Sequence, residues 1–252
     1  MTQVPTALWL TVSPHLKKFD QRLLCQLTRA AAIRRWEYIQ TPDEPCCLET
    51  PVELLHDYIR RCDCAEAPPH QVHLLGHGLS GIIGLLYARR FPHRVKSLTL
   101  LSVGAHPANN WHRQYYALRQ LLPCSRDMVL AQMVRSLFGM QGHRLTQALM
   151  QVLGQDLDTS LALHSLTDWT EIAGGGIESP LLVCWGAQDS ILGGSPQTQW
   201  QPWLKPNDRA WSCPGGRHFF HFDHAQQVAS TIRDYWQSLP TVRSQPLNLI
   251  QQ

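Results

Sequence analysis

The sequence lacks three features that would assign the chain to a common class at once. Its net charge is only +3 over 252 residues, and basic residues are scattered in pairs rather than gathered in one block. Nucleic-acid binding requires a concentrated basic face, so we expect no nucleic-acid partner. No uninterrupted apolar run reaches the roughly 18 residues of a spanning helix, so we expect no membrane span. The N-terminus has no cationic start before an apolar run, which predicts a cytoplasmic protein.

A metal-binding pattern is also missing. The chain has 8 cysteines, but their spacing fits no standard zinc motif. In a chain without an export signal they are expected to be reduced thiols rather than disulfides. Histidines recur at positions 218, 221 and 224, where a metal site is conceivable. A histidine-rich loop that leads into a helix is the simpler interpretation, and we expect neither a metal nor another cofactor.

The sequence does contain alternating strand and helix patterns. Hydrophobic residues make up 44% of the chain, which is enough for a packed core. Near-continuous apolar runs separated by helical spacing predict a parallel sheet covered on both faces. The expected strands are 7–12, 36–39, 72–75, 95–102, 181–185 and, more weakly, 209–213. The expected helices around them are 19–32, 50–62, 80–91 and 225–239.

One long stretch interrupts this alternation. Residues 105–179 hold only helical signals, and the strand pattern resumes after them. The sequence therefore predicts a core built from 1–104 and 180–240, with 105–179 inserted as a helical cap or lid. The tail 241–252 is polar with apolar spots and is expected to be loose.

Three segments carry a resemblance to a known family. The segment "VHLLGHGLSGIIGLLYARRFPHRVKSLTLLSVG", Val72 to Gly104, resembles the strand, nucleophile elbow, helix and strand of the α/β-hydrolase superfamily. Further on, "LLVCWGAQDSIL" and "PGGRHFFHFDH" resemble the loops that deliver the acid and the histidine of its catalytic triad. The resemblance implies an α/β-hydrolase fold with a mostly parallel sheet and a helical cap. It assigns Asp189 as the acid and His218 as the base, and it implies that the family's first hairpin is missing.

The elbow departs from the family at its central residue. The family's elbow often has Gly-His-Ser-x-Gly-Gly, and here Gly78 occupies the position of the serine. Glycine has no oxygen that could attack a carbonyl. Ser80 stands two residues later, where a serine more naturally caps the following helix or bonds its first N–H groups. A shifted nucleophile at Ser80 is the less favoured interpretation, because a displacement of several ångströms is costly in catalysis.

The oxyanion hole is a second departure. In the family one donor is the N–H of the residue after the nucleophile, here Leu79, and the other comes from the loop after the third strand. That loop contains Ser13 and Pro14 instead of a His-Gly pair, and proline has no N–H. The sequence therefore predicts that the nucleophile and the oxyanion hole are degraded together.

Aromatic residues suggest where a ligand or partner could bind. Trp111, Tyr115 and Tyr116 of the predicted cap would suit the wall of a pocket above Gly78, although ordinary cap core is the favoured interpretation. His77 beside the elbow is expected to be a packing or hydrogen-bonding residue. A further group, Trp200, Trp203 and Trp211, would form a partner-facing patch if exposed.

Three functions remain open at this point. The leading hypothesis is a non-catalytic pseudo-hydrolase that binds a protein partner or an apolar or acyl small molecule. The second is an active esterase-, thioesterase- or lipase-like hydrolase that uses Ser80, or a water activated by His218 and Asp189. The third is a small-molecule receptor that uses the capped cavity without chemistry.

Overall fold

The protein is built around a six-stranded parallel sheet. The computed structural model describes residues 6–40, 47–63, 69–104, 109–159 and 175–240, so the predicted loose tail lies outside the described residues. The order of the strands across the sheet is β2-β1-β3-β4-β5-β6, and every neighbouring pair is parallel. The strands are β1 (Ala7–Thr11), β2 (Ile33–Glu37), β3 (Val72–His77), β4 (Val95–Leu101), β5 (Leu181–Gly186) and β6 (Arg209–Cys213). No strand precedes β1 within the described ranges.

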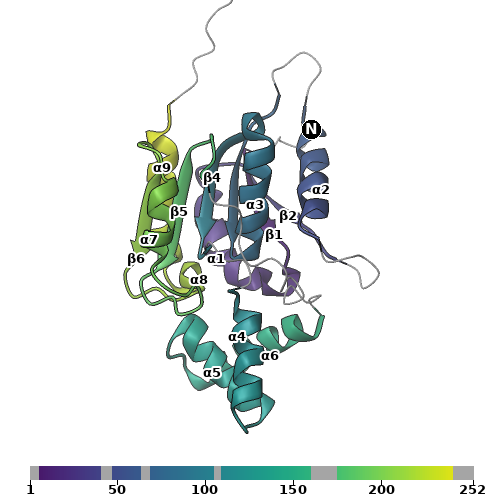
Figure 1. Cartoon of the computed structure of the whole chain (residues 1–252), viewed down its shortest axis with the longest axis vertical. Helices are drawn as coiled ribbons and strands as arrows, with labels where there is room; N and C mark the ends of the chain where they lie inside the picture. The colour runs from purple at the N-terminus through teal and green to yellow at the C-terminus, as the bar shows by residue number, and fades with distance from the viewer. Residues whose placement is uncertain (1–5, 41–46, 64–68, 105–108, 160–174, 241–252) are drawn as a thin grey trace, which may run out of the picture.

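Helices cover both faces of the sheet, as Figure 1 shows. Alternate side chains of each strand enter two different cores, because the side-chain period of a strand is two. Leu8 and Leu10 of β1 pack with α2 and α3, whereas Trp9 packs with α1 and α9. This explains why the strands are apolar on both faces. The core helices are α1 (Lys17–Leu27), α2 (Glu49–Arg60), α3 (Leu79–Arg90), α7 (Pro196–Trp200), α8 (Phe220–Asp223) and α9 (Ala225–Ser238).

The elbow helix α3 lies unusually close to the sheet because of glycine. A Cβ on Gly84 would lie 3.0 Å from Leu98 and 3.2 Å from Leu10. A Cβ on Gly81 would lie only 2.5 Å from a methyl group of Val103. The small residues of "GLSGIIG" therefore fix the height of α3 above the sheet and, with it, the position of the elbow.

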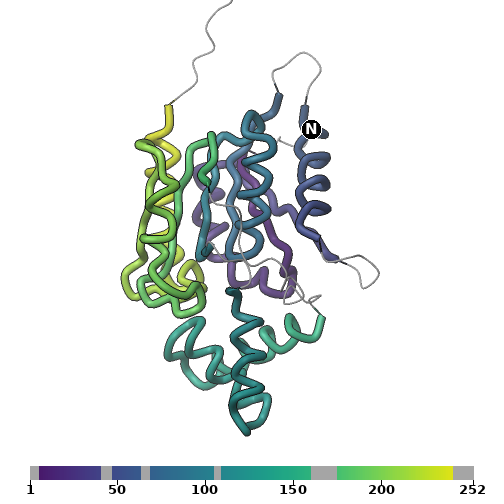
Figure 2. The backbone as a smooth tube through the Cα atoms, viewed as in Figure 1, coloured from purple at the N-terminus to yellow at the C-terminus, as the bar shows by residue number. Residues whose placement is uncertain are grey.

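Three helices form a separate layer beyond one end of the sheet. They are α4 (Trp111–Leu121), α5 (Arg126–Phe138) and α6 (His143–Thr159). They lie at the bottom of Figure 1, and Figure 2 shows the same layer below the sheet. The layer has its own apolar core, which also includes Phe19 of α1 and Phe219 and Phe222 of the histidine loop. The helical insertion therefore packs directly on the end of the sheet where the elbow lies, and we refer to α4–α6 as the cap.

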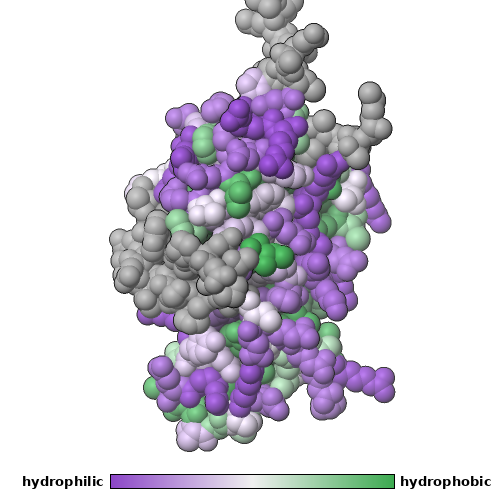
Figure 3. All heavy atoms as spheres, turned by 90° about the vertical axis from the view of Figure 1, so that its right-hand side faces the viewer, coloured by the Kyte–Doolittle hydropathy of each residue, from purple (hydrophilic) through white to green (hydrophobic). Residues whose placement is uncertain are grey.

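The described surface has no continuous apolar face in the view of Figure 3, where hydrophilic residues surround separate apolar patches on the core and the cap. Trp200 is 4% exposed and donates its indole N–H to the carbonyl of Val103 at 2.9 Å. Trp211 is half-buried, and Trp203 is exposed. The three tryptophans therefore do not form the exposed patch that their sequence proximity suggested. No helix within the described ranges is long and apolar enough to cross a bilayer.

Candidate functional site

Gly78 occupies the turn between β3 and α3. Its backbone angles are φ 51° and ψ −126°, a conformation that side-chain-bearing residues rarely adopt. The sharp turn is therefore retained although the position carries no side chain. A Cβ built on Gly78 would find no heavy atom within 4 Å outside its chain neighbours. The turn thus faces open space.

Asp189 and His218 lie together beside this space. The Nδ1 atom of His218 is 3.0 Å and 3.2 Å from the two carboxylate oxygens of Asp189. Asp189 also accepts the N–H of Ile191 at 2.9 Å. Burial alone would raise the pKa of Asp189. The charge of His218 and hydrogen bonds from His218, Ile191 and Ser102 outweigh burial, so the pKa lies below its ordinary value. The carboxylate is ionised at neutral pH and fixes the Nδ1–H tautomer of the imidazole, which leaves Nε2 for other partners.

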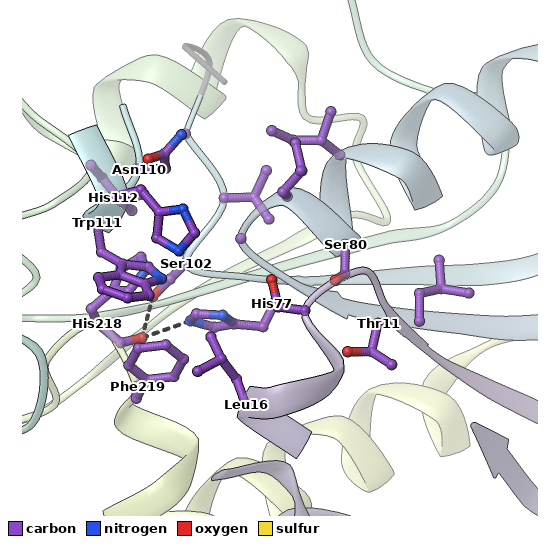
Figure 4. Close-up of a pocket in the computed structure, with 18 of the residues that line it drawn as sticks. Thr11, Leu16, His77, Ser80, Ser102, Asn110, Trp111, His112, His218 and Phe219 are labelled. Carbon is purple, nitrogen blue, oxygen red and sulfur yellow. Dashed lines mark hydrogen bonds between the residues drawn. The ribbon is translucent and has the colours of Figure 1, made fainter. Parts of the chain in front are cut away.

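The backbone of His218 is held by two further side chains. Figure 4 shows two hydrogen bonds that converge on its carbonyl oxygen, from Nε2 of His77 and from Oγ of Ser102, each at 2.9 Å. Burial, with smaller contributions from His218 and His221, holds the pKa of His77 well below its ordinary value. His77 is therefore neutral, and its single ring proton is on Nε2. Ser102 adopts a positive φ of 46° at the end of β4, which aims its hydroxyl at the histidine loop.

Ser80 is engaged elsewhere. It is the second residue of α3, it is 7% exposed, and its Oγ accepts the backbone N–H of Val12 at 3.0 Å. The helix begins after Gly78 and has no side-chain cap, so the predicted capping role of Ser80 is wrong. Instead, the hydroxyl ties the loop after β1 to the elbow helix. The sequence could not indicate this bond, because its two residues are 68 positions apart.

Two backbone N–H groups beside the pocket have no acceptor within the described part of the chain. Leu79 is the first residue of α3, where the N–H has no intrahelical partner. Ser13 lines the same pocket, and no acceptor is found for its N–H. Pro14 follows as the first residue of a short 3-10 helix, Pro14–Leu16. Pro14 removes its own N–H but not that of Ser13, so the loss of the oxyanion hole does not follow from this proline.

The pocket lies between the sheet end and the cap. Its atom-free space is about 790 Å³, part of it open to solvent. Gly78, His218 and Phe219 line it from the core, and Trp111 and His112 line it from the first turn of α4. The other two predicted wall residues are not among the lining residues. Tyr115 is buried in the cap core and Tyr116 is exposed, because only the first turn of α4 reaches the sheet end.

The comparisons with known proteins agree with this architecture. A family model described as alpha/beta hydrolase fold matches residues 40–159. A thermophilic esterase of known structure has a TM-score of 0.69 at 14% identity, covering 92% of this chain and 90% of that chain. A bromoperoxidase from Bacillus anthracis has a TM-score of 0.67 at 13% identity, covering 92% and 91%. The chain has the α/β-hydrolase fold. An uncharacterized protein of Synechocystis sp. is 42% identical and covers 92% of this chain and 90% of its own length. Another from Nostoc sp. is 40% identical over 91% and 90%.

The cap of this α/β-hydrolase-fold protein contributes a second histidine–aspartate pair that the sequence did not reveal. Nε2 of His112 lies 2.8 Å from Oδ2 of Asp156, and both side chains are buried. His112 follows the N-cap of α4, where Asn110 accepts the N–H of Arg113. Asp156 lies on α6, 44 positions further along the chain. His112 could have been noticed only as a polar residue early in an amphipathic helix, and the pairing itself depends on how the cap folds.

A third pair lies behind the elbow. Asp20 of α1 accepts Nε1–H of Trp9 at 2.8 Å and lies 3.1 Å from Nε2 of His221. This arrangement explains the histidine at position 221 as part of a buried structural network. His224 follows at the start of α9. No group of three or more potential metal ligands gathers among the residues that the structure describes.

The acid and histidine loops touch through backbone alone at Gly186. A Cβ there would lie 2.3 Å from the carbonyl oxygen of Arg217 and 2.4 Å from that of Gly216. We expect Gly186→Ala to lower the free energy of unfolding by about 2–3 kcal/mol, because backbone atoms must move to admit the methyl group. Urea unfolding measures this. Gly142→Ala is the control, since a Cβ at Gly142 meets nothing within 4 Å. Equal stability of the two variants would show that the loops are not so tightly packed.

Proposed function

We propose that this α/β-hydrolase-fold protein has no covalent nucleophile and functions by binding a small molecule in the pocket between the sheet end and the cap. The observation that carries the proposal is the elbow itself. Gly78 keeps the backbone angles of a sharp, strained turn but offers no attacking atom, and the space in front of it is open. The pocket beside it is lined on one side by the core and on the other by the cap.

Ser80 supports this proposal because it is a poor replacement for the missing nucleophile. A nucleophilic serine needs a base within hydrogen-bond reach of its hydroxyl. The hydrogen bond of the Ser80 hydroxyl is with the N–H of Val12, and no bond joins it to His218. Withdrawing the hydroxyl for catalysis would also leave a half-buried N–H without its partner.

A second candidate function is favoured by one specific observation. His218 is paired with Asp189 through Nδ1, while Nε2 has no partner within the described part of the chain. An imidazole in this state could act as a general base on a water molecule. The pair would then hydrolyse an activated ester without a covalent intermediate.

A reactive-probe experiment tests the leading proposal. The wild-type protein is incubated with a fluorophosphonate probe and, separately, with p-nitrophenyl acetate. We expect no covalent labelling, because Gly78 carries no side-chain oxygen and the hydroxyl of Ser80 is bonded to Val12, and no difference in turnover between wild type and Ser80→Ala. Labelling that Ser80→Ala abolishes would overturn the proposal. Turnover without labelling that is lost in His218→Gln would favour the second candidate instead.

A further inference from the structure

At Gly78 the space that a serine side chain would fill is open. In a serine-bearing elbow this space would hold a Cβ and an oxygen. Here no heavy atom beyond the chain neighbours lies within 4 Å of the Cβ position. A ligand oxygen can therefore descend to the place that a serine oxygen would take.

The pocket is also lined by a buried imidazole whose second nitrogen has no partner within the described part of the chain. His218 is only 3% exposed and lines the pocket, and Asp189 occupies Nδ1 alone. A buried polar atom without a partner is costly unless water or a ligand satisfies it. With Nδ1 engaged by Asp189, Nε2 is the ring nitrogen that can hydrogen-bond to a ligand. A carboxylic acid that enters brings the proton that a hydrogen bond to this nitrogen needs.

Two donors border the same space. The N–H of Leu79 stands at the N-terminus of the 12-residue helix α3, where the helix dipole favours negative charge. The N–H of Ser13 stands on the loop after β1 and likewise has no acceptor in the described part of the chain. The pocket's own carboxylate, Asp20, is engaged by Trp9 and His221. The elbow end of the pocket thus offers donors on several sides.

We propose that the pocket is a receptor for a carboxylic acid with an apolar body, which deepens the proposed function and rests on it. One carboxylate oxygen accepts the N–H groups of Leu79 and Ser13. The other lies over Gly78 and shares the proton of the acid with Nε2 of His218. These two oxygens occupy the places of the two ester oxygens that an acylated serine would have at this elbow. The apolar body lies against Leu16, Ile82, Val103, Trp111, Leu192 and Phe219, which line the remainder of the pocket.

Isothermal titration with a matched series of ligands tests the proposal. Straight-chain carboxylates from butanoate to dodecanoate are compared with the methyl ester and the primary alcohol of the tightest binder. A charge-assisted hydrogen bond corresponds to about a tenfold to hundredfold preference for the carboxylate over the alcohol. Equal affinities, or no binding by any carboxylate of the series, would overturn the proposal. Equal binding of carboxylate and alcohol would leave the proposed non-covalent function standing, whereas probe labelling of the wild type would contradict that function itself.

The variant Gly78→Ala locates the carboxylate. Its methyl group fills the place of one oxygen, so the carboxylate should bind at least about tenfold more weakly. Binding of the alcohol should change by less than about twofold, because the apolar wall is untouched. Gly215→Ala is the matched control, since Gly215 also has a positive φ, 71°, and open space at its Cβ, but does not line the pocket. Unchanged carboxylate affinity in a folded Gly78→Ala protein would place the carboxylate elsewhere and overturn the proposal.

Discussion

Gly78→Ser is expected to make an unreactive site react with fluorophosphonates and to raise p-nitrophenyl acetate hydrolysis by about 10²-fold or more over the wild type. The turn already has the φ of 51° that such a serine must adopt, and a Cβ there meets no heavy atom within 4 Å. His218 has Nδ1 fixed by Asp189 and Nε2 free to accept the hydroxyl proton. The N–H groups of Leu79 and Ser13 are available to a developing oxyanion. Mass spectrometry of the labelled protein and ester turnover measure the gain.

Two further variants show which groups cause the activity gained by Gly78→Ser. Gly78→Ala introduces the same backbone strain without an oxygen, and it should remain unlabelled. Gly78→Ser combined with His218→Gln should lose most of the gained activity, because the base is removed. A folded Gly78→Ser protein that is as inert as Gly78→Ala would show that the two N–H groups do not form a working oxyanion hole, as the Ser13-Pro14 sequence first suggested.

The second large effect concerns acid stability and arises far from the pocket. His73 on β3 is 6% exposed, lies 2.7 Å from Oγ of Ser97, and stacks on Trp236 of α9. Burial, with the charge of Lys96 acting in the same direction, lowers its pKa from 6.5 to about 3. Below pH 6.5 His73 binds a proton in the unfolded chain but stays neutral in the folded chain. The free energy of unfolding should therefore fall by about 1.4 kcal/mol per pH unit from this residue alone.

Urea unfolding of wild type and His73→Gln between pH 6.5 and 4.5 isolates this contribution. The variant lacks the titrating group. The slope of its free energy of unfolding against pH should therefore be smaller by the contribution of one proton, about 1.4 kcal/mol per pH unit. His77 also has a lowered pKa and contributes equally to both proteins. Asp189 is stabilising while ionised, and its pKa lies below 3.8, so its contribution is lost only at lower pH. Parallel pH profiles for the two proteins would contradict the assignment to His73.

The sequence predicted the four inner strands β1, β3, β4 and β5 well because they are apolar on both faces. The boundaries of β1, β3, β4, β5 and β6 differ from expectation by at most two residues. The weakest prediction was the second strand, expected at 36–39 and found at Ile33–Glu37. It lies at the edge of the sheet, and its half-buried residues include the polar Arg34 and Arg35, so it lacks the apolar pattern of the central strands.

The site was predictable only where a motif fixes a loop. The acid and histidine loops brought Asp189 and His218 together as the family resemblance implied. The bond from Val12 to Ser80 and the pair of His112 with Asp156 join residues distant in the sequence. Nothing in local spacing encodes such contacts, because they depend on how the loop after β1 and the cap dock on the elbow. Tyr116 illustrates the same limit, since an aromatic residue in a cap helix can face the solvent as readily as a pocket.

The two bonds to the carbonyl oxygen of His218 have a consequence for how a ligand is selected. His77 and Ser102 stand at the ends of β3 and β4. The backbone of His218 is therefore held by the two central strands and not by its own loop alone. An imidazole that is already immobile loses little conformational entropy when a ligand binds. Affinity then depends chiefly on how well the guest's shape and charge match a rigid receptor. The affinities of close chemical analogues should accordingly differ through their binding enthalpies. The structure of the protein should be almost the same with and without a bound ligand.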